Sequence, residues 1–290
     1  MVKIELSDSH RATVGGQRVR RALPMRARRT VGAWCFADHI GPDRIGSGGG
    51  LGIGPHPHIG LQTVTWLVAG ELLHRDSLGS VQVIRPGQLN LMTAGRGISH
   101  AEEATGHRGE MHGMQLWVAQ PDSTRNAAPA FEHHSELPRA ELPNGSATVL
   151  IGSFGGVGST ARRDTEHFGV EMVLGRGTCV VPVRPDDEHA IIVMAGEVSV
   201  GETAVVPGKL AYLGPGPDEI PLVATGSVRL MLLGGVPFET RPLIWWNFVA
   251  RDNGEVDRAA DAWNDGDERF GDPGSELARV AAPRRPWNPA

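Results

Sequence analysis

Short apolar segments separated by glycine and proline run along most of the chain. Many of them alternate apolar with polar residues or are rich in β-branched residues, as strands of a half-buried sheet do. The 39 glycines and 21 prolines supply frequent turns between them. The best strand candidates are LQTVTWLVAG (61–70), SVQVIRPGQLNLM (80–92), MHGMQLWVA (111–119), EMVLGRGTCVVPV (171–183), AIIVMAGEVSV (190–200) and SVRLMLLGG (227–235). This pattern predicts an all-β fold.

One segment near the C-terminus has the helical period instead. In DNGEVDRAADAWNDG (252–266), Asp252 or Asn253 can cap the N-terminus. The apolar residues after the cap recur at helical spacing, which predicts a short amphipathic helix; they are Val256, Ala259, Ala260 and Trp263. The proline-rich end, VAAPRRPWNPA (280–290), is expected to lie as an arm over the surface or over a neighbour.

An internal repeat divides the chain into two related modules. VAGEL (68–72) precedes RPGQLNLMTAGRG (85–97), and MAGEV (194–198) precedes VPGKLAYLGPGPD (206–218). Each copy has the order strand, glycine turn, strand, Pro-Gly and strand, as two tandem β-barrels would. We therefore expect an N-terminal domain over residues 1–130 and a C-terminal domain, with the helix and tail, over 131–290. QPDSTRNAAPAFEHH (120–134) is the expected linker.

Charge and cysteine usage restrict the partners and the compartment. A net charge of −5 and a pI near 6.2 give no overall attraction to nucleic acid or anionic lipid. Residues 18–29 hold six arginines, which fit a strand edge with solvated arginines better than a phosphate-binding patch. No apolar run approaches the roughly 20 residues of a membrane span. Without a signal-peptide pattern, and with only two cysteines in apolar surroundings, we expect a cytoplasmic protein.

Two pairs of polar residues suggest a metal site. His56 and His58 lie one residue apart in GPHPHIGLQTVTW, and His100 and Glu102 repeat this spacing in LMTAGRGISHAEEATGH. An extended strand sends residues i and i+2 to the same face, so each pair could converge on one point. Taken alone, each pair also fits an exposed polar loop. Together they offer three imidazoles and a carboxylate, a ligand set that suits iron, manganese, nickel, copper or zinc.

The internal repeat tests this hypothesis. Counting from matched positions, the counterpart of His56 in the second module is Pro182 and that of His100 is Pro221. Neither is a metal ligand, and His189 does not restore the set. Because the candidate ligands are confined to one copy, we expect a single functional centre in the first module and a structural partner in the second.

The chain resembles the pirins, proteins with two tandem cupin domains, which are double-stranded β-helix or jelly-roll barrels. The matching segments follow pirin order and span most of the chain to about residue 263. They are RALPMRARRTVGAWCFADHIGP, GPHPHIGLQTVTWLVAGELLHRDSLGS, VIRPGQLNLMTAGRGISHAEE, MQLWV, LLGGVPF and PLIWWNFV. The tail after Trp263 is outside the resemblance.

The resemblance implies one mononuclear metal in the N-terminal cupin, usually Fe(II), and no metal in the C-terminal one. Its implied ligands are His56, His58, His100 and Glu102. Other divalent metals such as Mn, Ni, Cu or Zn also suit these residues. Gln62 departs from the pattern, because many relatives carry glutamate there, and we expect this difference to remove a charge near the metal.

The first functional hypothesis is a metal-dependent dioxygenase, because some pirins are reported to have quercetinase (quercetin 2,3-dioxygenase) activity. A flavonol would bind the metal through its 3-hydroxyl and carbonyl groups, and Glu102 could accept the hydroxyl proton. Met114, Gln115 and Trp117 are candidates for the pocket wall, although strand residues of this kind also suit a plain core.

The second hypothesis is a non-catalytic regulator in which the iron oxidation state changes the binding of a protein partner. The resemblance implies it because some pirins are transcriptional co-regulators or modulators of metabolic enzymes. The arginine-rich stretch 18–29 would be a natural contact surface. A cupin isomerase or a sugar-binding module is a third reading, since a fold does not fix a function. The sequence does not decide among the three.

Overall fold

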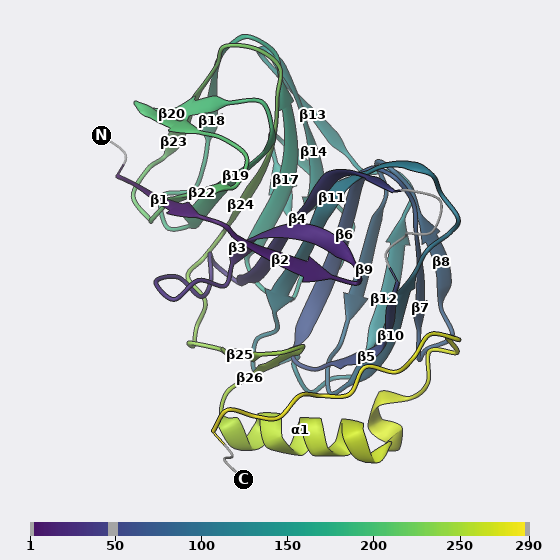
Figure 1. Cartoon of the computed structure of the whole chain (residues 1–290). Helices are drawn as coiled ribbons and strands as arrows, with labels where there is room; N and C mark the ends of the chain where they lie inside the picture. The colour runs from purple at the N-terminus through teal and green to yellow at the C-terminus, as the bar shows by residue number, and fades with distance from the viewer. Residues whose placement is uncertain (1–2, 46–51, 288–290) are drawn as a thin grey trace. The chain divides into compact units, whose positions relative to one another are not determined.

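The structure is a computed structural model that describes residues 3–45 and 52–287. Strands dominate the described residues, and their helical elements are α1 (Asn253–Asp265) and the short 3-10 turn η1 (Glu268–Phe270) (Figure 1). The predicted all-β fold class is confirmed.

The described residues form two compact units. The N-barrel comprises residues 13–19, 40–45, 52–133 and 240–287, and the C-barrel comprises residues 3–12, 20–39 and 134–239. These units differ from the contiguous ranges 1–130 and 131–290, because the segment with α1 returns to the N-barrel and two N-terminal segments join the C-barrel. The division of the two cupin domains near residue 130 stays a prediction.

The N-barrel is built from two sheets. Its four-stranded sheet has the order β5 (Ile53–His58), β10 (Ile98–Glu103), β7 (Leu72–Asp76), β8 (Val81–Ile84). The seven-stranded sheet has the order β12 (Ala130–His134), β9 (Leu89–Thr93), β6 (Leu61–Ala69), β11 (Gly109–Ala119), β4 (Trp34–Ile45), β3 (Gln17–Leu23), β2 (His10–Val14). Strands β4, β3 and β2 each include residues of both units. A hairpin follows later in the chain, β25 (Leu243–Trp245) and β26 (Phe248–Ala250).

The C-barrel repeats this plan. Its seven-stranded sheet has the order β1 (Ile4–Asp8), β22 (Lys209–Leu213), β19 (Glu188–Ala195), β24 (Val228–Gly235), β17 (His167–Leu174), β14 (Gly145–Ile151), β13 (Arg139–Leu142). Its four-stranded sheet has the order β18 (Gly177–Pro182), β23 (Glu219–Ala224), β20 (Val198–Val200), β21 (Thr203–Val205). The small hairpin is β15 (Ser153–Phe154) with β16 (Val157–Gly158). A buried, largely aliphatic cluster with members from both of these sheets forms its core.

Helix α1 has the ends and the buried face that its sequence predicts. The side chain of Asp252 accepts a hydrogen bond from the Glu255 N–H at 2.8 Å, which caps the N-terminus. Gly266 ends the helix in the left-handed conformation, with φ of 79°. The predicted stripe is buried against β26 and η1; its members are Val256, Ala259, Ala260 and Trp263.

Two local expectations need correction. The linker predicted over 120–134 ends in a strand, because β12 adds to β9 at the edge of the large sheet. The arginine-rich stretch is no sheet edge, since β3 lies between β4 and β2. Its arginines are also partly neutralised: Arg21 donates to Asp38 at 2.6 and 2.7 Å, and Arg28 to Glu5 at 2.6 Å.

Candidate metal centre

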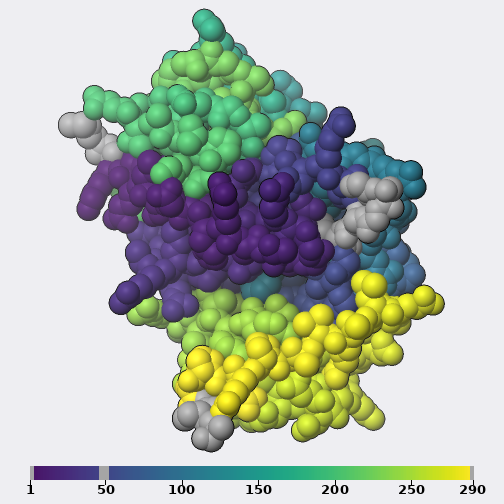
Figure 2. Space-filling view, viewed as in Figure 1, coloured from purple at the N-terminus to yellow at the C-terminus, as the bar shows by residue number. Residues whose placement is uncertain are grey.

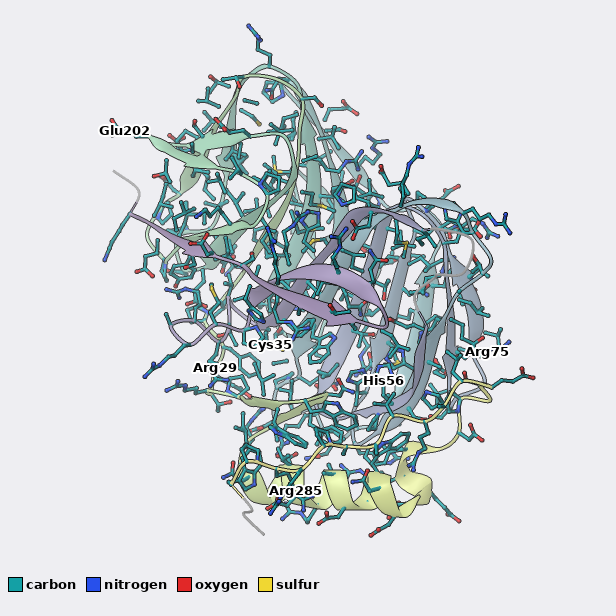
Figure 3. All side chains as sticks on the ribbon, viewed as in Figure 1. Arg29, Cys35, His56, Arg75, Glu202 and Arg285 are labelled. Carbon is teal, nitrogen blue, oxygen red and sulfur yellow. The ribbon has the colours of Figure 1, made fainter. Side chains whose placement is uncertain are left out.

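One face of the four-stranded sheet of the N-barrel collects polar side chains. Directly paired residues of antiparallel strands share a face, as do residues i and i+2. The register pairs His58 with Ile98, His56 with His100, His100 with Asp76, and Glu102 with His74. In Figure 3, His56 lies within the N-barrel and Arg75, of the opposite face of β7, lies at its outside. The sequence predicts that the two residues of each pair point to the same face of a strand, and the pleated sheet places them so.

Three imidazoles meet on this face. Each offers a ring nitrogen, and these nitrogens lie within 4.8 Å of one another for His56, His58 and His100. The closest pair is Nε2 of His58 and Nε2 of His100, 3.0 Å apart. All three side chains are buried. The fold thus joins two histidines of β5 to one of β10, although 44 residues separate His56 from His100 in the chain.

The backbone fixes the orientation of the two β5 histidines. His56 Nδ1 is 2.9 Å from the carbonyl oxygen of Gly54, and His58 Nδ1 is 2.9 Å from that of Asn247. A carbonyl oxygen only accepts, so both Nδ1 atoms carry the hydrogen and donate. In a neutral ring the Nε2 atom is then unprotonated, and its lone pair is free to bind a metal. For His58 this is the nitrogen that lies 3.0 Å from Nε2 of His100.

Burial keeps these rings neutral. Loss of solvation lowers the pKa of His56 to about 4, with the Gly54 hydrogen bond acting in the opposite direction. The same cause places the pKa of His58 and His100 well below the usual value, and the neighbouring imidazoles lower both further. At neutral pH the site is therefore a set of uncharged imidazoles, the form that binds metals.

The donor set fits a divalent transition metal. Two nitrogens that each lie about 2.1 Å from one metal ion, at about 90° to one another, are about 3.0 Å apart. The distance of 3.0 Å between His58 Nε2 and His100 Nε2 agrees with that geometry. A nitrogen-only cluster of this kind suits iron, nickel, copper or zinc better than it suits magnesium or calcium.

Glu102 lies beside this cluster. It is buried on the same face, and burial raises the pKa of its carboxyl to about 7. The pairing of β10 with β5 has an irregularity between His100 and Glu102, so that Glu102 pairs with Ile53. Such bulges redirect a side chain. The group of atoms within 4.8 Å comprises the three histidines alone among the described residues, and a metal bond to Glu102 stays a prediction.

Two further residues of this face were missed by the sequence analysis. Nδ1 of His74 is 3.4 Å from Nδ1 of His100, and Nε2 of His74 is 3.0 Å from Oδ2 of Asp76. The signal was present in LLHRD, where His74 and Asp76 repeat the i, i+2 spacing for a third time. Burial acts to raise the pKa of Asp76, but hydrogen bonds from His74 and Ser80 outweigh it and the pKa is lowered.

The large sheet contributes an aromatic and a polar wall. Trp117 meets the His58 ring edge-on, with centroids 5.2 Å apart. Gln115 lies two residues away on the same face and accepts a hydrogen bond from Thr65 at 2.9 Å. Met114 has the opposite parity, so the alternation sends it to the other face of the sheet. Of the three candidate wall residues, the geometry supports Gln115 and Trp117.

Gln62 also lies on the opposite face from Trp117. The register pairs Trp117 with Thr63 and pairs Gln62 with Val118 and Thr93. The amide of Gln62 donates to the Thr93 hydroxyl at 3.0 Å, and the side chain is fully buried. The expectation that this position sets a charge near the metal was therefore wrong, because neighbouring residues of a strand point to opposite faces.

The hairpin β25–β26 supplies the acceptor for His58. Its turn contains Trp246, which has a φ of 50°, a left-handed value that is uncommon outside glycine. The next residue, Asn247, presents the carbonyl oxygen that holds His58 Nδ1. Non-glycine residues in this region persist where the surroundings determine them, often beside functional sites. The Trp246 ring packs edge-on against Phe248, with centroids 5.4 Å apart.

The described part of the chain after α1 lies along β5. The Val280 N–H donates to the carbonyl of Pro55 at 2.9 Å, and Trp263 Nε1 donates to the carbonyl of Val280 at 2.8 Å. A Cβ atom on Gly54 would come within 1.9 Å of the Ala278 carbonyl oxygen, so only glycine fits there. In Figure 2 this segment, drawn in yellow, crosses the surface next to the helix. It therefore covers the outer edge of the strand that carries His56 and His58.

Comparison with known proteins agrees with this architecture. The family profile described as Pirin matches residues 16–118, and that described as Pirin C-terminal cupin domain matches residues 171–271. The two predicted cupin domains are thereby confirmed. Among the described residues no helix is both long and apolar enough to cross a membrane.

Individual relatives cover nearly the whole chain. A Pseudomonas aeruginosa protein named "Putative quercetin 2,3-dioxygenase" is 46% identical over 275 residues, which is 94% of this chain and 87% of the relative. A "Pirin-like protein" of Caulobacter vibrioides is 38% identical, over 89% of this chain and 92% of its own. A crystal structure from Acinetobacter baumannii, titled as quercetin 2,3-dioxygenase, is 41% identical with a TM-score of 0.95, covering 99% of this chain and 97% of that one.

Proposed function

The chain belongs to the pirin family, and from this we propose that it is a metal-dependent dioxygenase of the quercetinase type, which cleaves flavonols. The observation that supports the proposal most strongly is the cluster of His56, His58 and His100, buried inside one barrel with ring nitrogens that converge. Relatives that carry the quercetin dioxygenase name add to it.

The three histidines would hold the metal, with Glu102 as a fourth ligand. We propose Fe(II) as the native ion, although manganese, nickel, copper or zinc would also suit the donors. When bound, the ion supplies Lewis acidity and one place at which a flavonol and dioxygen can meet. With four protein ligands, an octahedral ion would have two further positions open to substrate.

The chain's own residues would orient the substrate and move one proton. The flat aromatic rings of a flavonol suit the face formed by Trp117, and Gln115 offers a polar group on the same wall. Glu102 is buried on the histidine face, two residues from His100 along β10. We propose that it accepts the proton of the 3-hydroxyl group, as a positioned base within reach of the substrate.

An oxygen-uptake assay tests this proposal. Protein purified without oxygen and loaded with Fe(II) is mixed with quercetin and a panel of other flavonols, and oxygen consumption is followed together with the loss of flavonol absorbance. We expect equal molar consumption of flavonol and oxygen. The His56→Ala variant is the control, because it lacks one ligand of the cluster and should consume neither.

A negative result would favour the regulator. If the Fe(II)-loaded protein consumes no oxygen with any flavonol but changes its affinity for a protein partner on oxidation, the catalytic proposal fails. The arginine stretch 18–29 would offer fewer free cations to that partner than its composition implies, since Arg21 and Arg28 are paired with carboxylates. A cytoplasmic location stays a prediction under both functions.

A further inference from the structure

The Nδ1 atoms of the three cluster histidines have two different kinds of partner. His56 and His58 donate from Nδ1 to backbone carbonyl oxygens, those of Gly54 and Asn247. His100 instead faces a side chain, because its Nδ1 lies 3.4 Å from Nδ1 of His74. A carbonyl oxygen can only accept, but an imidazole nitrogen can either donate or accept. The orientation of the His100 proton therefore depends on His74.

The proton positions on His74 and His100 follow from the Asp76 carboxylate, which lies at the other end of this series of contacts. The Asp76 carboxylate accepts, so the Nε2 atom of His74, at 3.0 Å from Oδ2, carries a hydrogen. The neutral form of His74 has one N–H, and with that hydrogen on Nε2 its Nδ1 atom is the acceptor that faces His100. His100 then donates from Nδ1, and its Nε2 atom faces the cluster as a bare lone pair. This is the same ring state that the backbone gives His56 and His58.

Asp76 and His74 are themselves held in place. The other carboxylate oxygen of Asp76, Oδ1, accepts from the N–H groups of Leu78 and Ser80 at 2.9 and 3.1 Å. The ring of Phe131 stacks on that of His74, with centroids 4.5 Å apart and an interplanar angle of 11°. Both polar side chains are buried. The pair is thus a fixed support of the kind that orients metal-binding histidines.

We propose that Asp76 and His74 are positioning residues that hold His100 in the ring state able to bind the metal. The proposal rests on the proposed metal centre and concerns its affinity rather than the flavonol reaction. Neither residue is a ligand in this scheme. Each acts through the next, from Asp76 to His74 and from His74 to His100.

Asp76→Asn is the sharpest variant, because it should reverse the whole chain. The Asn carbonyl oxygen can keep the two backbone N–H bonds, and its NH₂ group then faces His74 as a donor. His74 would have to accept at Nε2 and donate from Nδ1. His100 would accept at Nδ1 and carry its proton on Nε2, where the metal should bind. Asp76→Asn would thus place a proton on Nε2 of His100, although Asp76 does not contact that ring in this scheme.

The experiment measures Zn(II) affinity and the His100 ring state. Zn(II) is diamagnetic and has no redox chemistry. Its dissociation constant is measured by competition with a chromophoric chelator, and ring protons are located by ¹⁵N–¹H correlation spectra of ¹⁵N-histidine protein, with and without Zn(II). We expect Asp76→Asn and His74→Phe to weaken Zn(II) binding by about 10- to 100-fold, the usual range for outer partners of metal ligands. His74→Gln, which keeps one donor and one acceptor, should lose less.

Arg75→Gln is the matched control, since Arg75 lies between the two residues on the opposite face of β7 and pairs with Glu103. It should bind Zn(II) as the wild type does. In metal-free protein, the His100 proton should sit on Nδ1 in the wild type and on Nε2 in Asp76→Asn. Should His74→Phe fail to fold, Asp76→Asn alone decides.

The outcomes separate this inference from the proposed function. Wild-type protein that binds Zn(II), together with Asp76→Asn and His74→Phe variants of unchanged affinity and unchanged His100 spectrum, would overturn the positioning role and leave the metal centre intact. Wild-type protein that binds no metal would overturn both. A wild type that binds metal but consumes no flavonol, with weakened variants, would retain the inference and reject only the dioxygenase.

Discussion

Strands β5 and β10 of the N-barrel have counterparts in β18 and β23 of the C-barrel, and the two pairs fill their barrels differently. The inward positions of β5 and β10 carry His56, His58 and His100. In the C-barrel, β18 and β23 pair Cys179 with Leu222 and Val181 with Ile220, all within the aliphatic core cluster. Pro182 and Pro221, the counterparts that the internal repeat assigned to two ligands, do lie on these paired strands.

This difference shows that the same barrel architecture can either fill its interior with an aliphatic core or line it with a cluster of histidines. An aliphatic interior needs no hydrogen bonds, whereas a buried imidazole nitrogen without a hydrogen-bond partner costs free energy. In the N-barrel, Nδ1 of every cluster histidine lies near an acceptor or another ring. In the C-barrel, Nε2 of the buried His167 has no hydrogen-bond partner. Neither ring nitrogen of the buried His189 has one. Histidines make a site only where their partners are also supplied.

The largest expected effect is the loss of metal binding in His100→Ala. Binding free energies of about 10–16 kcal/mol for four-ligand zinc sites imply roughly 2.5–4 kcal/mol for each ligand, so affinity should fall by about 100- to 1000-fold. The fold should persist with a modest decrease in melting temperature, because the barrel is stabilised by core burial. Elemental analysis, competition titration and circular dichroism check this against His107→Ala, which removes a histidine of the same barrel outside the cluster. Gross unfolding of His100→Ala would show a structural site instead.

The reverse experiment places a histidine in the C-barrel. Val181→His should lower the free energy of unfolding by about 3–4 kcal/mol, because a larger polar ring enters an aliphatic core that offers it no partner. It should bind no Zn(II). Val180→His, one residue away on the exposed face, should change stability by less than about 0.5 kcal/mol. Urea denaturation measures both, and a stable Val181→His protein that gains a metal would break the comparison.

The pH dependence of stability should reveal His167 as a structural, neutral histidine. Burial lowers its pKa in the folded chain to about 4, while the unfolded chain titrates near 6.5. Between these pH values only the unfolded state gains the proton. The contribution of His167 to the free energy of unfolding is therefore fully present above pH 6.5 and decreases as the pH falls towards 4. The decrease amounts to about 3 kcal/mol.

The His167→Gln variant removes this titration. Its free energy of unfolding should depend less on pH between 6.5 and 4 than that of the wild type, by about 3 kcal/mol. Urea denaturation at a series of pH values measures the difference. Parallel curves for the two proteins would mean that His167 is protonated equally in both states.

Glu102→Gln should separate turnover from metal binding. The amide keeps the shape but cannot accept the substrate proton, so we expect oxygen uptake to decrease by about 100-fold with metal retained. Glu103→Gln is the control, because that carboxylate pairs with Arg75 and Ser275 instead. Equal rates for wild type and Glu102→Gln would reject the base role and leave Glu102 at most a ligand.

The smallest effect is expected at Gln62. Gln62→Glu puts a carboxyl group where a buried amide donates to Thr93, which should lower the free energy of unfolding by about 1–2 kcal/mol. Metal affinity and turnover should change less than threefold, since the side chain is on the far face from Trp117. A shift of the metal's redox potential in this variant would contradict that placement.

The sequence by itself determined whatever depends on neighbours along the chain. The period of two that sets His56 beside His58 is a property of any extended strand, and the cap at Asp252 with its buried stripe is a property of one helix. The six pirin-like segments also identified the family, because they occur together and in order. Local geometry and residue type sufficed for these conclusions.

Only the tertiary structure decided which faces meet. The register of three strands joins His100 to His56 and to Asp76, and pairs Glu102 with His74 on the same face. The carbonyl of Asn247 and the segment around Val280 reach β5 from far along the chain. Such contacts depend on the pairing of the whole sheet, and a shift of one residue reverses every face. No local pattern encodes that choice, which is why Gln62 was misplaced. The spacing of His74 and Asp76 was visible in the sequence, but the meeting of their face with His100 was not.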